Sequence, residues 1–374
     1  LSPEWGRAED FLQERAIRGG VLITGEARPG KRVDLVFAFP LLEASEATPR
    51  LRWLALDLET DREERIVAAS LVSPACGLGP EAGRGGLGAC EGFFLGPPTG
   101  LPNARSFPDE ASLLEAFAAR LQEIDPDVLT GWNIVDFDFR VLAARFQALG
   151  LAFSLGRSDE PARLIEREGR RDVASVPGRA VIDAMRLVRA SGERFDDLRL
   201  ETVAQAILGE GKSVHEEGEA KLAELDRLRA EDPAAFVSYC IRDSELVLGI
   251  LDSTGLDRLT QARAGLTGLP LDLAWTSIPA FERVYSAGLR ERHIAVPARE
   301  ARKVSGAAGG TVLDPLAGFY EAVLVFDFRS LYPSLMRTFN IDPLAYARAG
   351  ARPPAPGDIV APNGARFERE SGIL

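Results

Sequence analysis

The feature that most constrains the fold is an apolar run at residues 51–58, because its hydrophobic side chains would cover both faces of an extended chain. Trp53 and Ala55 would point to one face of such a strand, and Leu54, Leu56 and Leu58 to the other. A strand that is apolar on both faces is typical of an α/β sheet with helices on each side. Strand, loop and helix patterns follow one another from residue 50 onward, so the sequence predicts an α/β fold.

Other elements can be placed from pattern alone. Strand-like runs occupy residues 19–27 and 31–39, and an amphipathic helical pattern occupies residues 112–124. An alternating run at 322–328 predicts a final strand that leads into a turn and a helix. At 374 residues the chain is too long for one ordinary domain, so two or three units are expected.

The composition limits the classes of function. Hydrophobic residues make up 46% and charged residues 27%, the balance of a globular protein. The net charge of −12 argues against a general nucleic-acid coat, but it allows an enzyme whose acids hold metal ions. Three cysteines and two histidines provide neither a disulfide framework nor a zinc site. No apolar stretch approaches bilayer length and no secretory leader is visible, so a cytoplasmic protein without a membrane partner is expected.

Two acids stand at the end of the first predicted strand. Asp57 and Glu59 are two residues apart and therefore share one face of the strand. Two carboxylates so close repel each other, and burial makes each costlier unless a cation or donor compensates. The alternative is a strand end that emerges into solvent, where both acids are simply hydrated.

A third acid lies inside an apolar helical stripe. Residues 231–251 have a marked helix start, with Asp232 as the N-cap and Pro233 in the first turn. Asp243 falls on the apolar face of this helix, where a charge needs a partner. An arginine or backbone donors are the ordinary partners of such a buried acid.

A fourth acid, Asp138, lies in the first turn of a helix that Asp136 can cap. Charge complementarity with the helix dipole is enough to explain Asp138 by itself. One arrangement nevertheless accounts for all four acids together, because clustered carboxylates can bind two divalent metal ions. Oxygen-only ligands suit magnesium or manganese rather than zinc.

Short motifs at these acids resemble those of a known family. DLE at 57–59, NIVDFD at 133–138 and YCIRD at 239–243 resemble, in order, the three exonuclease motifs of proofreading family B DNA polymerases. DFRSLYPS at 327–334 resembles the first polymerase motif of that family. The stretches SDEPARLIEREG, LRLETVAQAILGEGKS and RTFNIDPLA are similar to its bacterial polymerase II branch. The resemblance extends over nearly the whole chain from about residue 50.

The resemblance implies a domain plan. It assigns residues 1–49 to the end of a β-rich N-terminal domain and 50–272 to a ribonuclease H-like 3′–5′ exonuclease domain with a mixed sheet flanked by helices. Residues 273–296 would be a connection, and 297–374 the start of an α+β polymerase palm. The later polymerase motifs do not follow, so residues 1–374 are expected to act as an exonuclease without polymerising.

The resemblance also assigns roles in the exonuclease site. Two Mg²⁺ or Mn²⁺ ions would be held by the four acids Asp57, Glu59, Asp138 and Asp243. Tyr239, one helical turn before Asp243, would orient the attacking water. The frayed 3′ end of single-stranded DNA would contact Thr60, Asn133 and Phe137. For Phe137, packing in the core is an equal alternative.

The chain departs from the family pattern at two places. Arg199 stands where the family has a small hydroxyl residue before a leucine, and it is left out of the predicted site. The linker motif before the palm lacks its tyrosine and ends at Gly309 and Gly310.

In the palm segment the resemblance assigns four residues. Asp327 would bind metal, and the backbone amides around Ser330 and Leu331 would receive a triphosphate at a helix start. Tyr332 would exclude a ribose 2′-OH, with a packed turn aromatic as the alternative.

The sequence thus predicts a DNA-directed DNA polymerase with a proofreading exonuclease. Its partners would be single-stranded 3′ ends, primer-template DNA and deoxynucleoside triphosphates, with a sliding clamp as a further candidate. The rival interpretations are a stand-alone 3′–5′ exoribonuclease and an inert DNA-binding piece. The SLYPS segment at 330–334 argues against the exoribonuclease, since that enzyme needs no polymerase motif.

Overall fold

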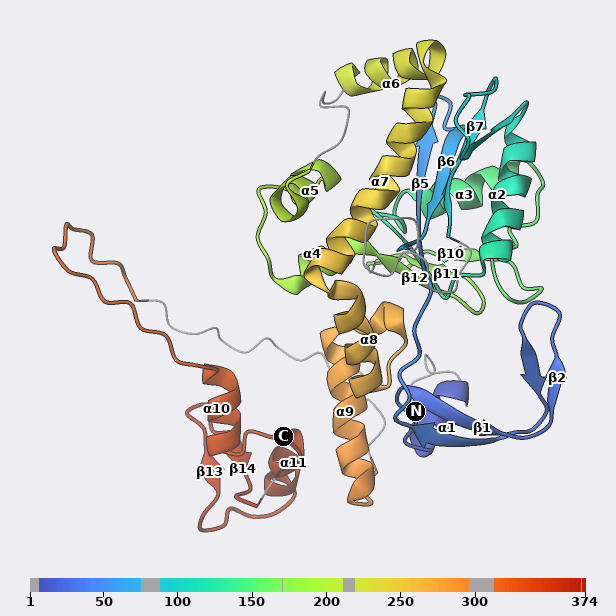
Figure 1. Cartoon of the computed structure of the whole chain (residues 1–374). Coiled ribbons are helices and arrows are strands. Elements are labelled where there is room, and N and C mark those ends of the chain that lie inside the picture. Colours follow the sequence, from blue (N-terminus) through green and yellow to red (C-terminus); the bar gives the residue numbers. More distant parts are fainter. Residues whose placement is uncertain (1–6, 75–87, 170, 211–218, 296–312, 371) are drawn as a thin grey trace. The chain divides into compact units, whose positions relative to one another are not determined.

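The structure, a computed structural model, describes residues 7–74, 88–169, 171–210, 219–295, 313–370 and 372–374. The chain forms two compact units (Figure 1). One unit is Leu12–Ala280, and the other combines Leu1–Phe11 with Phe281–Leu374. The linker glycines Gly309 and Gly310 lie outside the described residues.

The larger unit is built on a mixed six-stranded sheet with the order β12-β9-β5-β6-β7-β8. Its strands are β5 (Trp53–Thr60), β6 (Ile66–Val72), β7 (Cys90–Leu95), β8 (Ala104–Phe107), β9 (Val128–Gly131) and β12 (Ala180–Asp183). β5 pairs antiparallel with β6 and parallel with β9, while β6 pairs antiparallel with β7. The parallel pairs β7–β8 and β9–β12 complete the sheet. The mixed sheet confirms the predicted α/β fold.

Strand β5 is buried on both faces, as its sequence predicts. Leu54, Leu56 and Leu58 pack into one apolar core, and Trp53 packs into another on the opposite face. Each face therefore needs its own layer of helices, because the apolar side chains of β5 must leave water on both sides.

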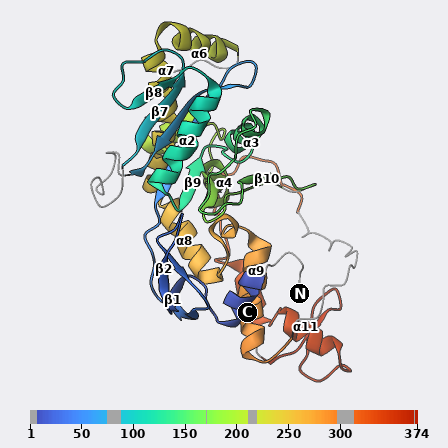
Figure 2. The same cartoon turned by 90° about the vertical axis from the view of Figure 1, so that its right-hand side faces the viewer.

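The helices supply these two layers (Figure 1, Figure 2). The first core is closed by α2 (Glu110–Ile124) and α3 (Asp138–Ala148). The opposite face is covered by α4 (Ala184–Ser191), α5 (Leu200–Leu208), α6 (Glu219–Glu231), α7 (Pro233–Thr254) and α8 (Leu256–Thr267). The 3₁₀ turn η2 (Leu271–Leu273) packs beside α8.

Helix α7 begins where the sequence predicts. Asp232 is its N-cap and accepts a hydrogen bond from the Ala235 amide, and Pro233 is the first helical residue. Gly255 ends the helix in the left-handed conformation with φ 65°, which glycine adopts without strain. The predicted apolar stripe faces the sheet, and Asp243 is buried within it.

The segment before the sheet is β-rich, as predicted. β1 (Gly20–Thr24) pairs with β4 (Leu41–Ser45), and β2 (Ala27–Pro29) pairs with β3 (Leu35–Phe37). Helix α1 (Arg7–Glu14) precedes them and crosses the boundary between the two units. A further hairpin of β10 (Arg163–Ile165) and β11 (Val173–Ser175) follows α3 in the chain.

The smaller unit contains α10 (Leu331–Thr338), α11 (Pro343–Gly350) and the short pair β13 (Ile359–Val360) and β14 (Arg366–Phe367). Helix α9 (Ser277–Glu291) spans the boundary at residue 280. Among the described helices of both units, none combines the length and apolarity needed to cross a bilayer.

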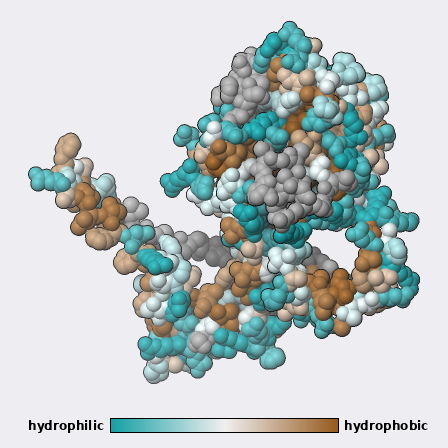
Figure 3. Space-filling view, in the orientation of Figure 1, coloured by the Kyte–Doolittle hydropathy of each residue, from teal (hydrophilic) through white to brown (hydrophobic). Residues whose placement is uncertain are grey.

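The strand predicted at 322–328 does not form. This segment is extended, and its apolar side chains are exposed to solvent, as the brown surface of the segment before α10 shows (Figure 3). No strand among the described residues pairs with it. An isolated strand leaves its backbone groups without partners, so the apolar alternation alone cannot stabilise it.

Candidate metal centre

Asp57 and Glu59 lie at the end of β5, on the face of the sheet that α7 covers. Both are partly exposed, unlike the leucines that alternate with them. The pairing of β5 with β6 shifts register between Glu59 and Thr60, as at a β-bulge or a similar irregularity. Such bulges occur next to active sites, where they change the direction of a side chain.

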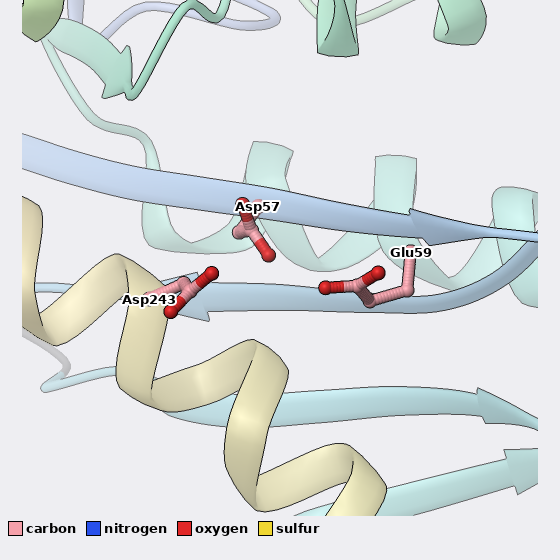
Figure 4. A group of neighbouring side chains, drawn as sticks. All are labelled: Asp57, Glu59 and Asp243. Carbon is pink, nitrogen blue, oxygen red and sulfur yellow. The ribbon is translucent and has the colours of Figure 1, made fainter. Parts of the chain in front are cut away.

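Asp243 approaches the two strand acids from the middle of α7. Ligand oxygen atoms of Asp57, Glu59 and Asp243 all lie within 4.8 Å of one another, and we call these three residues the acid cluster. Figure 4 shows the three carboxylates directed toward one another from the strand and the helix. The structure therefore brings together three of the four acids that the sequence predicts as metal ligands.

The acid cluster has the chemistry of a metal site. Three carboxylates this close repel one another strongly, and the partly buried setting reduces the screening that water provides. A hard divalent cation with a preference for oxygen ligands offsets that repulsion. The residues present thus fit a divalent metal ion.

Asp138 is the first residue of α3 and is almost completely buried. Its Oδ1 accepts a hydrogen bond from the Leu58 amide at 3.1 Å, which ties α3 to β5 between the two strand acids. Burial, and then the charges of Glu59 and Asp183, raises the pKa of Asp138 well above the usual range. Asp138 is near the acid cluster electrostatically, but it is not one of its three members.

The start of α3 differs from the sequence prediction in one respect. The N-cap position is Phe137 rather than Asp136, and no side chain caps this helix. Asp136 instead forms an ion pair with Arg186 at 2.7 Å. Asp183 caps α4 by accepting a hydrogen bond from the Arg186 amide, which is a structural role.

Tyr239 lies one turn before Asp243 on α7 and is buried beside the acid cluster. Burial, and then the negative charges of the cluster, raises the pKa of its phenol far above the ordinary value. The phenol is therefore protonated at neutral pH and can act as a hydrogen-bond donor. Burial likewise raises the pKa of the neighbouring Cys240 thiol, which stays uncharged.

The predicted DNA-contact residues lie in two places. Asn133 and Phe137 are in the loop before α3, and Thr60 is at the end of β5. Asn133 has a positive φ of 62°, in the left-handed region that asparagine adopts more readily than most other residues. The side chain of Phe137 is 42% exposed, which removes the alternative that it packs in the core. Thr60 ends β5 directly after the register shift. Arg199 is exposed and forms an ion pair with Asp197 at 3.5 Å.

The predicted palm residues lie in the smaller unit. Asp327 is exposed in the extended segment before α10 and is not part of a strand. Ser330 is the N-cap of α10 with a φ of 53°, and Leu331 begins the helix. Tyr332 is exposed, so it does not pack as a turn aromatic. The helix start predicted after residue 330 is therefore present.

The structure also reveals polar residues near the acid cluster that sequence patterns did not single out. Ser70 and Ser244 are completely buried, and their hydroxyl oxygens are 2.8 Å apart. The only sequence signal was a serine within the apolar run of β6, which is too common to indicate a role.

Profiles of known protein families match two segments of the chain. The profile of "DNA polymerase family B, exonuclease domain" matches residues 97–203, which include Asn133, Phe137 and Asp138. The profile of "DNA polymerase family B" matches residues 282–349, which include Asp327 and Tyr332.

Individual relatives extend over more of the chain. It is 32% identical to DNA polymerase II of Escherichia coli (strain K12) over 373 residues, or 98% of this chain and 45% of that protein. It is 30% identical to the DNA polymerase delta catalytic subunit of Caenorhabditis elegans over 252 residues, or 62% of this chain and 23% of that protein.

A solved structure shares the fold. The family B DNA polymerase from the hyperthermophilic archaeon Pyrobaculum calidifontis has a TM-score of 0.72 and 24% sequence identity. The match covers 100% of this chain and 47% of that one. This chain thus spans less than half the length of these relatives.

Proposed function

The chain belongs to DNA polymerase family B, and from this premise we propose that its acid cluster hydrolyses the 3′-terminal phosphodiester of DNA. One observation carries the proposal. Asp57 and Glu59 of a strand and Asp243 of a helix converge, so that their ligand oxygens lie within 4.8 Å of one another. The exonuclease domain would extend over residues 50–272, between the N-terminal segment 1–49 and a connection at 273–296. The palm would begin at 297.

The acid cluster would hold two divalent ions, Mg²⁺ or Mn²⁺, with Asp138 as the fourth acid. When bound, such a pair of ions activates water and stabilises the leaving phosphate oxygen. The chain itself supplies the negative charge and fixes the positions of the ligands. Asp138 gains its position from the hydrogen bond that the Leu58 amide donates.

Tyr239 would orient the attacking water. Burial raises the pKa of the phenol, which keeps its proton, so Tyr239 would serve as a hydrogen-bond donor to that water. Burial on the inner face of α7 holds the ring in place. The proton released by water must then go to another acceptor or to solvent.

The substrate would be a single-stranded 3′ end. Phe137 offers an exposed aromatic face, on which any base can stack, and Asn133 offers an amide. A duplex end must first be unpaired and unstacked before its last base reaches such a site. This cost favours frayed ends, as proofreading requires.

The palm residues support a second activity for the whole polymerase, templated DNA synthesis. Asp327 would bind metal, and the amides at Ser330 and Leu331 would meet the triphosphate at the start of α10. Tyr332 would exclude the 2′-OH of a ribonucleotide. Primer-template DNA and deoxynucleoside triphosphates would be the substrates, and a sliding clamp is a candidate partner.

The test is digestion of 5′-labelled single-stranded DNA and of matched RNA, with Mg²⁺, with Mn²⁺ and with a chelator. We expect shortening of the DNA from its 3′ end that requires metal and is lost in Asp57→Ala. Preferred digestion of RNA would instead favour the stand-alone exoribonuclease. Binding of DNA without any digestion would favour the inert DNA-binding piece.

A further inference from the structure

Three buried groups connect α7 to the sheet beside the acid cluster. Ser70 of β6 donates a hydrogen bond to the Cys240 carbonyl at 3.1 Å, and its Oγ lies 2.8 Å from Ser244 Oγ. Either hydroxyl can donate to the other. We call this pair the hydroxyl bridge (Ser70 and Ser244).

The hydroxyl bridge adjoins the metal-ligating acids on both elements. Ser70 lies directly opposite Asp57 in the β5–β6 pair, and such pairs point to the same face of a sheet. Ser244 follows Asp243 in α7. The Cys240 thiol adds a third link, because its Sγ donates to the Asp57 carbonyl at 3.5 Å.

Apolar packing does not require these hydroxyls. The surrounding core contains apolar residues of β6 and α7, including Val67, Val237 and Ile241, which already hold the helix against the sheet. Ser70 and Ser244 are each 0% exposed, so each hydroxyl has a desolvation cost that only a hydrogen bond offsets. What the bridge adds to packing is direction, because a hydrogen bond fixes both distance and angle.

Direction matters here because the carboxylates repel one another. Without a cation, repulsion drives Asp243 and its helix away from Asp57 and Glu59. A link between the neighbours of Asp57 and Asp243 opposes that movement at the place where it begins. The ligands then remain close together before metal binds, which reduces the cost of binding.

We propose that Ser70 and Ser244 are positioning residues, which set the separation of Asp243 from Asp57 and thereby the affinity of the site for divalent metal. The proposal rests on the proposed function, since it assumes that the acid cluster binds metal. Neither serine is a member of the acid cluster. Their effect passes through the placement of α7.

The experiment measures Mn²⁺ binding by electron paramagnetic resonance on the 374-residue chain, together with thermal unfolding in the absence of metal. The variants are Ser70→Ala, Ser244→Ala and the double variant. We expect each single variant to weaken Mn²⁺ binding about tenfold, the scale of outer-shell partners of metal sites. The double variant should lose little more, because both changes break the same bridge.

Thr260→Val is the matched control. Thr260 is also completely buried, and its hydroxyl joins the Leu256 carbonyl to the Trp275 indole, away from the acid-bearing elements. We expect this variant to lose thermal stability and to keep the Mn²⁺ affinity of the parent. If the alanine variants do not fold, Ser70→Cys and Ser244→Cys decide the question, because the thiol is a weaker donor of similar size.

The outcomes separate the two proposals. Folded serine variants that bind Mn²⁺ as tightly as the parent would overturn the positioning role, even if the parent digests DNA. Equal losses of affinity in Thr260→Val and the serine variants would also overturn it, since general destabilisation would then suffice. A parent that neither binds Mn²⁺ nor digests DNA would refute the proposed function, and the positioning role with it.

Discussion

Asp57 and Asp243 carry like charges and lie close together, although they belong to two elements that are distant in the sequence. The chain keeps these acids although their repulsion and partial burial reduce the stability of the fold. A function that needs both charges explains why a neutral pair does not stand there instead.

Replacing Asp57 or Asp243 by asparagine keeps the size of the side chain and removes the charge. We expect each change to slow digestion of single-stranded DNA by more than about a hundredfold, beyond the loss typical of outer-shell residues. Without metal, each variant should unfold at a higher temperature than the parent, because repulsion in the acid cluster is relieved. The measurements are digestion rates in Mg²⁺ and thermal unfolding in a chelator.

Asp232→Asn is the control for these variants. It makes the same chemical change at the N-cap of the helix that carries Asp243, and asparagine caps helices as well as aspartate does. Digestion should continue at the parent rate. A parent rate in Asp57→Asn or Asp243→Asn would show that the acid in question is not a metal ligand.

Phe137 tests the substrate preference at a single side chain. Phe137→Ala should lower the ratio of digestion rates on single-stranded and paired 3′ ends, because stacking of a base contributes about 1–3 kcal/mol. Leu149→Ala, which truncates an exposed apolar residue at the other end of α3, is the control. An unchanged ratio in Phe137→Ala would count against stacking on this ring.

Among the elements, the sequence pattern predicted α7 correctly but was wrong about a strand at 322–328. The helix could be predicted because its N-cap, its first-turn proline and its apolar stripe are local signals. The segment at 322–328 has a local strand pattern, but a strand depends on a partner for its hydrogen bonds.

Asp342 joins several segments of the smaller unit. Its Oδ1 accepts hydrogen bonds from the Tyr285 hydroxyl at 2.9 Å and from the amides of Leu344 and Ala345, at the start of α11. Its Oδ2 accepts from the amides of Ile373 and Leu374. Burial by itself raises the pKa of Asp342, but these donors outweigh burial and lower the pKa below the ordinary 3.8.

The lowered pKa of Asp342 predicts how the stability of this unit depends on pH. A carboxyl group with a lowered pKa in the folded state stabilises the fold above its unfolded pKa, and this contribution is lost as the pH falls through the folded pKa. Asp342→Asn should therefore destabilise the unit by about 1–3 kcal/mol at neutral pH, because amide donors would face backbone donors. The difference from the parent should shrink as the pH falls below the ordinary 3.8 and through the lowered folded-state pKa of Asp342.

Amide hydrogen exchange at residues 340–350 measures this local stability. Asp314→Asn, at an exposed acid of the same unit, should leave the exchange unchanged at every pH. An effect of Asp342→Asn that persists undiminished at low pH would show that the charge of the carboxylate is not the cause.

At the scale of the whole molecule, the candidate acids belong to different compact units. The acid cluster lies in Leu12–Ala280, whereas Asp327 lies in the smaller unit. Nucleotidyl transfer with two metal ions needs carboxylates gathered beside the primer end. Asp327 stands exposed in a segment that forms no strand. Among the described residues, it belongs to no group of three or more potential metal ligands.

We therefore predict that residues 1–374 by themselves do not extend a primer. The assay supplies primer-template DNA, all four deoxynucleotides and Mg²⁺, in an Asp57→Ala background so that digestion cannot hide synthesis. A full-length relative serves as the positive control. Reproducible template-directed extension by residues 1–374 would contradict this prediction once a contaminating polymerase is excluded.

The sequence by itself determined the α/β fold, the start of α7 and the identity of the candidate acids, because periodicity, capping and motif spacing are properties of neighbouring residues. Only the tertiary structure decided which acids meet. It brought Asp57, Glu59 and Asp243 together, while Asp138 was held instead by the Leu58 amide. It also revealed the hydroxyl bridge and left the segment at 322–328 unpaired among the described residues. Both depend on contacts between residues far apart in the chain, which local pattern cannot encode.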